Sequence, residues 1–516
     1  MTSFPWLSLI VFFPLIGAVL CFLVKAESSR WLALGFTVGN FFLSLPLWWL
    51  FDSSTATMQF VERASWISSP PINYSLGMDG ISFPLVLMTT FLMPFCVTVS
   101  WTAIEKSVPL FMSMLLIMES AMVGVFVALD FVLFYVFWEV MLIPMYLLIG
   151  IWGSSHKVTE AGPLRFVWKW FDIGGREYAA MKLTLMLLVG SAFILVGLLA
   201  LYFSSGAGTF DMAVLAKAHY PKSLQIWTFV MFWLGFGSLA GVFPFHTWSP
   251  DGHASAPTAV SMLHAGVLMK LGAFGVMRIG MMMLPDGAQF WAPIVGGVAV
   301  VNVVYGAMSA LSQKDLKYII AYSSVSHMGV VMLGAATLTQ SGWNGAVYQM
   351  FAHGIMTGLF FALVGHIYER AHSREVAKMG GFATVMPGVA AFFTLAGLSS
   401  LGLPGTAGFV AEFLVFAGGW QSPRPWWSIC GVIGAFVTAV YVLRVSRAVF
   451  FGDGPSDHFH DLRDVRKIEW APLWILGGTL LLCGIWPRLL LDFIDPTTTN
   501  YLRMALGSVL PVGVLP

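Results

Sequence analysis

Ionisable residues interrupt several long apolar stretches of this 516-residue sequence. A charged group in the hydrocarbon core of a membrane costs about 2.5 to 3.5 kcal/mol or more, so such residues usually have a function. A single one could be a satisfied packing residue, but a row along the chain is hard to explain in that way. Because carboxyl, amine and imidazole groups all exchange protons, these types predict proton transfer inside a membrane. The residues are Glu119, Glu139, Lys270, His327, His353 and Glu412.

Glycine and proline break two of the apolar stretches. Such breaks are tolerated at membrane depth only where protein packs them or where they line a wet cavity, and paired broken helices favour an ion path between repeats. Taken singly, either break could be an ordinary proline kink. The first stretch, residues 235–253, contains Gly241 and Pro244, and the second, residues 400–413, contains Gly402, Pro404, Gly405 and Gly408.

The elements that must position these residues are transmembrane helices. The chain is 58% hydrophobic and only 10% charged, which is far from the composition of a soluble domain. With roughly 20 apolar residues per span, it predicts an all-α polytopic membrane protein of about 14 transmembrane helices, without a cleaved signal peptide. The predicted spans are 3–25, 31–51, 80–101, 109–128, 129–151, 180–203, 225–247, 257–280, 290–311, 316–337, 341–368, 388–420, 427–451 and 471–492.

The two breaks fall in the seventh and twelfth spans, which predicts two inverted five-helix repeats, spans 4–8 and 9–13. The domain boundaries follow from this division. Residues 1–108 hold the first three helices, and residues 452–516 hold a cytoplasmic loop, the last span and a C-terminal tail. The first repeat covers 109–280 and the second covers 281–451.

Charge and cysteine usage limit the function classes. A net charge of +1 offers no basic field for nucleic acid. Lys and Arg concentrate in the loops after odd-numbered spans, which predicts both termini on the non-cytoplasmic side of a bacterial inner membrane or an equivalent energy-transducing membrane. The cysteines form no paired motif, so neither a metal site nor an iron–sulfur cluster is expected in this chain. They are Cys21, Cys96, Cys430 and Cys483.

Four segments resemble the antiporter-like subunits of complex I, the NADH:quinone oxidoreductase, and the resemblance covers roughly residues 1–490. Within that family, the PDGHASAPTAVS form, the FPWL opening and the YERAHSRE turn (368–375) are most similar to the subunit M group, the counterparts of mitochondrial subunit 4. The segments are LDFVLFYVFWEVMLIPMYLLIGIWG (129–153), FPFHTWSPDGHASAPTAVSMLHAGVLMKLGAFGVMR (243–278), SQKDLKYIIAYSSVSHMGVVMLG (312–334) and GLSSLGLPGTAGFVAEFLVFAGG (397–419).

The resemblance implies roles for the buried residues. It implies that Glu139 serves an input half-channel, Lys270 is a central relay, His327 and His353 bridge, and Glu412 is the acidic output residue. Glu119 would be a secondary acidic site. The resemblance further implies neighbouring complex I membrane subunits as partners, with NADH, FMN, iron–sulfur clusters and quinone on those partners and no cofactor here.

One position departs from the family pattern. The family normally has a lysine before the break in the seventh span, paired with the glutamate of the fifth, and here that place is Leu239. Because an unpaired buried carboxylate favours its neutral form, we expect Glu139 to be largely protonated at rest and the first half-channel to be altered or silent. His246 is a candidate replacement cation, or alternatively a cap on the broken helix. Residues 154–179 form a longer segment than the loop that the family usually has between the fifth and sixth spans. The extra length could serve a variant contact with a partner subunit, or it could be a neutral insertion.

Other functions remain open from sequence. A subunit of a multisubunit Na⁺/H⁺ antiporter or of a membrane-bound hydrogenase would share the broken helices and the central lysine. A transporter of organic solutes would need a central pocket with several polar side chains, which isolated Glu, Lys and His residues do not provide. A purely structural membrane subunit is the remaining alternative, because of Leu239.

Overall fold

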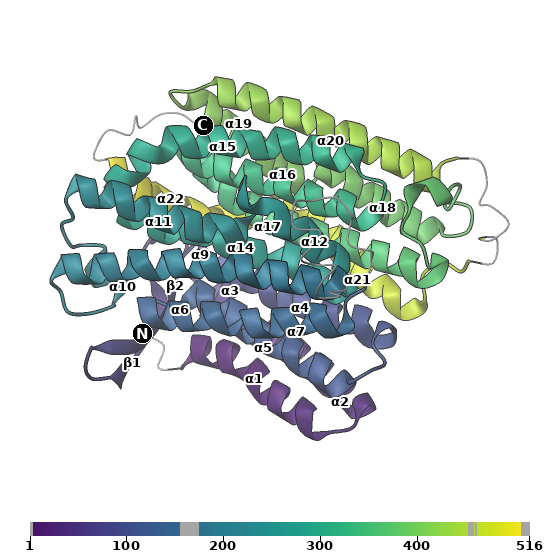
Figure 1. The fold of residues 1–516 in the computed structure, drawn as a ribbon, viewed down its shortest axis with the longest axis horizontal. Coiled ribbons are helices and arrows are strands. Elements are labelled where there is room, and N and C mark those ends of the chain that lie inside the picture. The colour runs from purple at the N-terminus through teal and green to yellow at the C-terminus, as the bar shows by residue number, and fades with distance from the viewer. Residues whose placement is uncertain (1–3, 155–174, 453–458, 460–461, 507–516) are drawn as a thin grey trace, which may run out of the picture.

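The computed structural model describes residues 4–154, 175–452, 459 and 462–506. Most of the predicted insertion at 154–179 therefore lies outside the described residues. Long helices run roughly side by side along the longest axis of the molecule (Figure 1), with α1 (Trp6–Leu23) and α2 (Ala26–Ser44) at one edge and α20 (Trp426–Phe450) at the other. The further long helices are α4 (Ser82–Ala103), α5 (Val108–Val127), α9 (Gly175–Ser205), α11 (Lys222–Ala240), α15 (Pro285–Ser312), α16 (Leu316–Ala336) and α17 (Gln340–Ala371).

Shorter elements complete the bundle. Several of them are halves of interrupted helices, and β1 and β2 form one antiparallel hairpin. They are α3 (Pro46–Leu50), β1 (Gln59–Ile67), β2 (Ile72–Met78), α6 (Phe131–Val140), α7 (Leu142–Trp152), α10 (Met212–Leu215), η1 (Phe245–Thr247), α12 (Trp248–Ser255), α13 (Thr258–Leu263), η2 (His264–Leu268), α14 (Met269–Gly275), η3 (Val276–Met281), η4 (Val376–Lys378), α18 (Pro387–Ser400), α19 (Ala407–Gln421), η6 (Lys467–Glu469), α21 (Trp470–Ile485) and α22 (Arg488–Leu506).

Within the described residues, 12 helical segments are long and apolar enough to cross a membrane, or up to 13 with a bent pair. The bent pair is α21 with α22, which meet at an angle of 63°. The predicted span 388–420 is two helices, α18 and α19, with 14 and 15 residues, and neither is long enough to be counted alone. The multi-pass membrane architecture is confirmed, whereas fourteen crossings require α18 and α19 to form one broken span.

Both predicted breaks are present in the backbone. Helix α11 ends at Ala240, Gly241 follows with φ 73°, and α12 begins only at Trp248. Helix α18 ends at Ser400, Gly402 has φ 74°, and α19 begins at Ala407. Positive φ at a helix end favours glycine, which has no Cβ to clash with the preceding carbonyl. The same residue type therefore ends the first half of each broken element.

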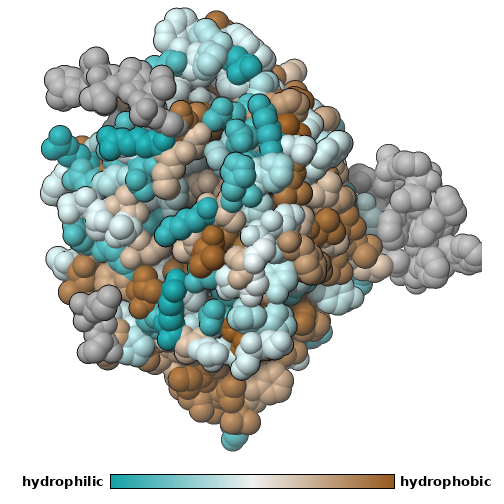
Figure 2. All heavy atoms as spheres, turned by 90° about the vertical axis from the view of Figure 1, so that its left-hand side faces the viewer, coloured by the Kyte–Doolittle hydropathy of each residue, from teal (hydrophilic) through white to brown (hydrophobic). Residues whose placement is uncertain are grey.

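Burial separates central helices from peripheral ones. In Thr258–Met281 and Gln340–Ala371, every residue of the most apolar window is buried, whereas only 39% is buried in α9 and in α20. Large apolar side chains of the peripheral helices face outward, among them Val189, Phe203 and Phe436. Figure 2 views the bundle end on, with hydrophilic residues across this end and hydrophobic residues gathered along the flank and the lower rim. This distribution suits helices whose sides contact lipid and whose ends contact water.

Two backbone junctions have the same form at different places in the chain. Asp130 caps α6 and pairs with Asp211 in an isolated β-bridge, and Asp315 caps α16 and pairs with Glu375 in the same way. At each junction the first N–H of the capped helix donates to a carbonyl one residue before the bridged partner, Phe210 and Arg374 respectively. Each junction thus ties the start of a helix to the chain that follows the next long helix.

Candidate functional site

Lys270 lies at the centre of the most buried part of the molecule. It is in α14, between the π-helical turns η2 and η3, and is fully buried. π-helical turns are rare and occur frequently at functional sites. The Lys270 ammonium donates to the carbonyl oxygen of Ala265, and its Nζ lies 2.5 Å from Nδ1 of His353. A buried amine is therefore placed to share a proton with an imidazole.

The two predicted bridging histidines face each other across α16 and α17. The ring centroids of His327 and His353 are 5.3 Å apart. Nε2 of His353 has no hydrogen-bond partner among the described residues. Nδ1 of His327 lies 3.2 Å from the amide nitrogen of Gln349, and its Nε2 lies 3.0 Å from the hydroxyl of Ser400. With the Gln349 amide nitrogen donating to Nδ1, neutral His327 carries its proton on Nε2 and donates it to Ser400.

Glu412 ends this row at the second break. It is in α19 and is 6% exposed, and its Oε1 lies 3.5 Å from Nδ1 of His327. A Cβ at Gly402 would lie 2.8 Å from Oε2 of Glu412, so the glycine of the break also leaves room for the carboxylate. The row Lys270–His353–His327–Glu412 crosses four helices, and each member contacts the next. We name these four residues the central row.

Three predicted site residues lie apart from the central row. Glu119 is fully buried in α5 and accepts a hydrogen bond of 2.7 Å from the side chain of Asn40. Glu139 is half-buried at the end of α6, and its Oε1 has no hydrogen-bond partner among the described residues. His246 is buried between the rings of Phe243 and Tyr305, at centroid distances of 5.7 and 5.1 Å. The described residues show no hydrogen bond or ion pair between His246 and Glu139.

A lysine of another helix pairs with the half of the broken helix that follows the first break. Lys182 lies in α9, and its Nζ is 2.6 Å from Oδ2 of Asp251 in α12. The hydroxyl of Tyr318 donates to the other oxygen of Asp251 at 3.2 Å. Leu239 is fully buried, without a polar group in its side chain. In this half of the chain, the lysine Lys182 thus pairs with Asp251, which follows the break, and Leu239 precedes it.

Sequence reasoning missed two central histidines. His253 and His264 are fully buried with ring centroids 4.2 Å apart, and none of their ring nitrogens is hydrogen-bonded within the described residues. Both belong to the quoted segment 243–278, and His264 precedes Lys270 by six residues, which was a usable signal. Lys317, also missed, is buried and donates to the carbonyl of Ala256 at 2.6 Å. These residues connect the central lysine with α12 and the start of α16.

Comparisons with known proteins agree with this architecture. Residues 128–175 and 166–438 match the family model described as NADH:quinone oxidoreductase/Mrp antiporter, transmembrane. The chain is 37% identical to NAD(P)H-quinone oxidoreductase chain 4 1 of Nostoc sp., over 99% of this chain and 93% of the relative. It is 38% identical to NADH-quinone oxidoreductase subunit M of Rhodobacter capsulatus, over 96% of each.

A solved structure extends the comparison. A chain of respiratory complex I from Thermus thermophilus with bound NADH superposes with a TM-score of 0.86 at 28% identity, and the match covers 97% of this chain and 100% of that one. The resemblance inferred from sequence motifs is therefore confirmed. The chain belongs to the NADH:quinone oxidoreductase/Mrp antiporter transmembrane family.

Proposed function

We propose that this chain is a proton-translocating membrane-arm subunit of a complex I-type NADH:quinone oxidoreductase. The observation that carries the proposal is the central row, a chain of buried, proton-exchanging side chains at the centre of the bundle. The full-length similarity to relatives named as subunit M or chain 4 supports it. The chain would act as part of an enzyme and would translocate protons, with the redox reaction carried out on partner subunits.

The geometry supports a stepwise relay. A protonated Lys270 donates to Nδ1 of His353, which then carries a proton on both nitrogens and can release the one on Nε2. His327 takes up a proton at Nδ1 once the Gln349 amide yields that position, and the nearby Glu412 carboxylate stabilises the resulting imidazolium. Each arriving charge alters the field at the next group, which provides electrostatic coupling along the row.

NADH, FMN, iron–sulfur clusters and quinone would bind to partner subunits, among them the neighbouring antiporter-like chains. The wide spacing of the four cysteines in the sequence supports the placement of the iron–sulfur clusters on other chains. The chain would supply the proton path and receive energy from those partners. Glu139, Glu119 and His246 are proposed as side elements of the path, with the input altered at Leu239.

The finer topology is also part of the proposal. We infer fourteen crossings, with α18 and α19 forming the twelfth, and inverted repeats at 109–280 and 281–451. The matching junctions at Asp130 and Asp315 support the repeats, because each caps the second helix of its repeat and bridges to the chain after the third. The matching glycines of the two breaks support the same division. Both termini would lie outside the cytoplasm of an energy-transducing membrane.

The family also includes Mrp-type antiporters, so the partner set decides between the two readings. Purification from native membranes in mild detergent, with mass spectrometry of bound chains, should recover other complex I membrane subunits and iron–sulfur proteins. Recovery with small antiporter subunits alone would overturn the redox-driven function. In the purified complex, Lys270→Met should abolish proton pumping into vesicles, whereas Lys378→Met, at an exposed lysine, should not change it.

A further inference from the structure

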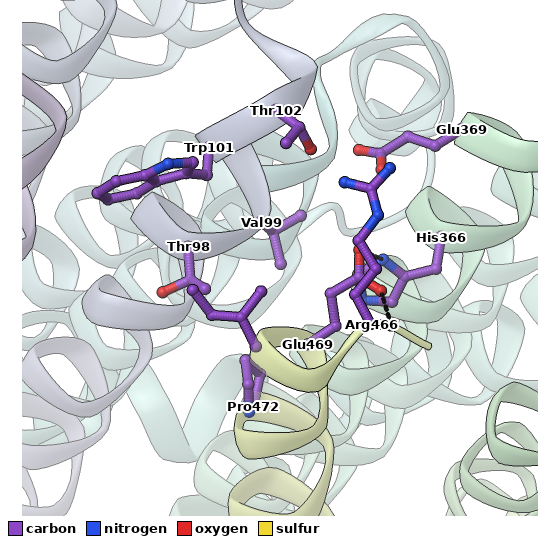
Figure 3. A pocket seen from close by; sticks show the side chains of 10 residues that line it. Thr98, Val99, Trp101, Thr102, His366, Glu369, Arg466, Glu469 and Pro472 are labelled. Atoms are coloured by element: carbon purple, nitrogen blue, oxygen red, sulfur yellow. Dashed lines mark hydrogen bonds and ion pairs between the residues drawn. The ribbon is translucent and has the colours of Figure 1, made fainter. Parts of the chain in front are cut away.

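A cluster of three potential metal ligands lies away from the central row, at the end of α17. His366 and Glu369 are one helical turn apart on α17, and Glu469 ends η6 directly before α21. Figure 3 shows His366 and Glu469 side by side, the Glu369 carboxylate beyond the guanidinium of Arg466, and the end of α4 opposite. One candidate ligand atom from each residue can be chosen so that all three lie within 4.8 Å of one another. Three donors from two separate segments thus meet at one point.

The histidine of this cluster has unused binding capacity. His366 is 3% exposed, and neither ring nitrogen has a hydrogen-bond partner among the described residues. Its Nδ1 lies 3.7 Å from Oε1 of Glu469, too far for a hydrogen bond. The Glu369 carboxylate likewise has no hydrogen bond or ion pair in the described part of the chain. Because buried polar groups are normally paired, the buried imidazole of His366 indicates a missing ligand, and the half-buried Glu369 carboxylate is available beside it.

The third donor is already held in place. The Arg370 guanidinium donates to Oε2 of Glu469 at 2.5 Å, and the backbone N–H of Arg466 donates to the same oxygen at 2.7 Å. The other carboxylate oxygen of Glu469, Oε1, therefore faces His366. Metal-binding carboxylates are commonly oriented by outer hydrogen bonds of this kind. The cluster therefore has both a set of donors and a supporting shell.

A small cavity of about 40 Å³ adjoins the cluster, lined also by Thr98, Trp101 and Pro472. A space of this size holds at least one water molecule. Zinc sites with three protein ligands keep a fourth position for water, and the cavity supplies that position.

We propose that His366, Glu369 and Glu469 form a zinc-binding site. An imidazole favours Zn²⁺ over Mg²⁺ or Ca²⁺, which prefer oxygen ligands alone. The two carboxylates neutralise the ion, and the neighbouring Arg370 and Arg466 guanidiniums oppose it, so the site binds more weakly than an all-acidic one would. Bound zinc would tie α17, the helix that carries His353, to the start of α21. The site is independent of proton pumping and of the partner set.

Zinc binding can be measured on the intact complex after treatment with a chelator. Titration with zinc alone, against a competing indicator, should show one site fewer per complex in His366→Ala and in Glu369→Gln, or an affinity roughly 100-fold weaker at that site. His372→Ala is the matched control, because His372 is exposed at the end of the same helix. Arg466→Gln keeps the backbone N–H and should tighten binding about tenfold by removing a positive charge.

X-ray absorption at the zinc edge supplies the second readout. The difference between wild type and His366→Ala should show one imidazole nitrogen among oxygen ligands. Equal zinc stoichiometry and affinity in wild type, His366→Ala and Glu369→Gln would overturn the site, and so would a zinc spectrum without imidazole. If His366→Ala fails to assemble, the conservative Glu369→Gln variant still tests the site. Glu369 is only half-buried, so we expect this variant to fold.

Discussion

At the scale of single residues, the function depends on how each ionisable side chain is paired. His327 shows this most clearly, because α17, α18 and α19 each supply one of its neighbours, Gln349, Ser400 and Glu412. Glu139 is the opposite case, since its buried Oε1 lacks any hydrogen-bond partner among the described residues. Glu412 therefore has an imidazole beside its carboxylate, whereas the described residues show no ion pair for Glu139.

Replacing Glu412 tests the output end of the central row. Glu412→Gln removes the proton acceptor while keeping the shape of the side chain, so we expect pumping by the assembled complex to fall about 100-fold. Glu412→Asp should retain part of the activity, because it keeps the carboxylate at a longer distance. The measurement is quenching of a pH-sensitive dye in sealed vesicles, with Glu375→Gln as the exposed control. Undiminished pumping by Glu412→Gln would remove Glu412 from the path.

The part that Glu139 takes in pumping is a second prediction at this scale. Leu239 supplies no cation for this carboxyl, so we expect the first half-channel to be altered or silent. Glu139→Gln should therefore reduce pumping far less than Lys270→Met does, measured by quenching of a pH-sensitive dye in sealed vesicles. A loss of pumping in Glu139→Gln as large as that in Lys270→Met would contradict this role of Leu239.

At the scale of elements, the broken helices need partners for their freed backbone groups. Asn302 in α15 supplies them at the first break, since its Oδ1 accepts from the N–H of Phe243 at 2.6 Å and its amide donates to the carbonyl of Gly241 at 3.0 Å. The breaks themselves were predictable, because glycine and proline in an apolar run are visible in the sequence. Asn302 was not predictable, because its role depends on a helix about sixty residues away in the chain packing beside the break.

Asn302→Leu keeps a similar volume and removes the two hydrogen bonds to the break, together with a third to the carbonyl of Val325. Each buried backbone group left without a partner costs about 1–3 kcal/mol, so we expect a marked loss of thermal stability and weaker pumping. Asn344→Leu, at a buried asparagine outside the break, is the control for loss of a buried amide. Thermal unfolding of the purified complex compares the two variants. A change in stability no greater than that of a surface substitution would show that water or a rearranged helix satisfies the break.

At the scale of the whole molecule, the C-terminal helix is joined to the centre by a buried ion pair. Arg278 at the end of the central lysine span donates to the carboxylate of Asp79 and to the hydroxyl of Tyr501 in α22, the latter at 2.8 Å. The sequence predicted the span but ended the last crossing within what is α22. The bend at residues 486–487 was missed because α22 is amphipathic, and its apolar residues extended the predicted span.

Breaking this ion pair should loosen α22. Arg278→Met leaves the fully buried Asp79 carboxylate without its cation, and we expect a loss of about 3–5 kcal/mol in stability. Arg278→Met combined with Asp79→Asn should recover part of that loss, because no charge then stays unpaired and the asparagine oxygen can still accept from the backbone N–H groups of Ile81 and Ser82. Thermal unfolding together with proteolysis of the 488–506 segment measures both. A double variant less stable than Arg278→Met would show that the charge of Asp79 is stabilised by other groups.

The orientation of the whole bundle can be predicted from charge and parity together. With the fourteen crossings proposed above, the hairpin of β1 and β2 follows the second crossing and the Ser312–Asp315 turn follows the ninth, so we expect these segments on opposite sides of the membrane. Because Lys and Arg favour the cytoplasmic side, a cysteine at Ser54 should react with a membrane-impermeant maleimide from outside, and one at Ser312 only in inverted vesicles. Both positions are exposed, so a failure to react cannot be due to burial of the thiol within the protein. Reaction of both positions from the same side would contradict an odd number of crossings between them and, with it, the inverted repeats.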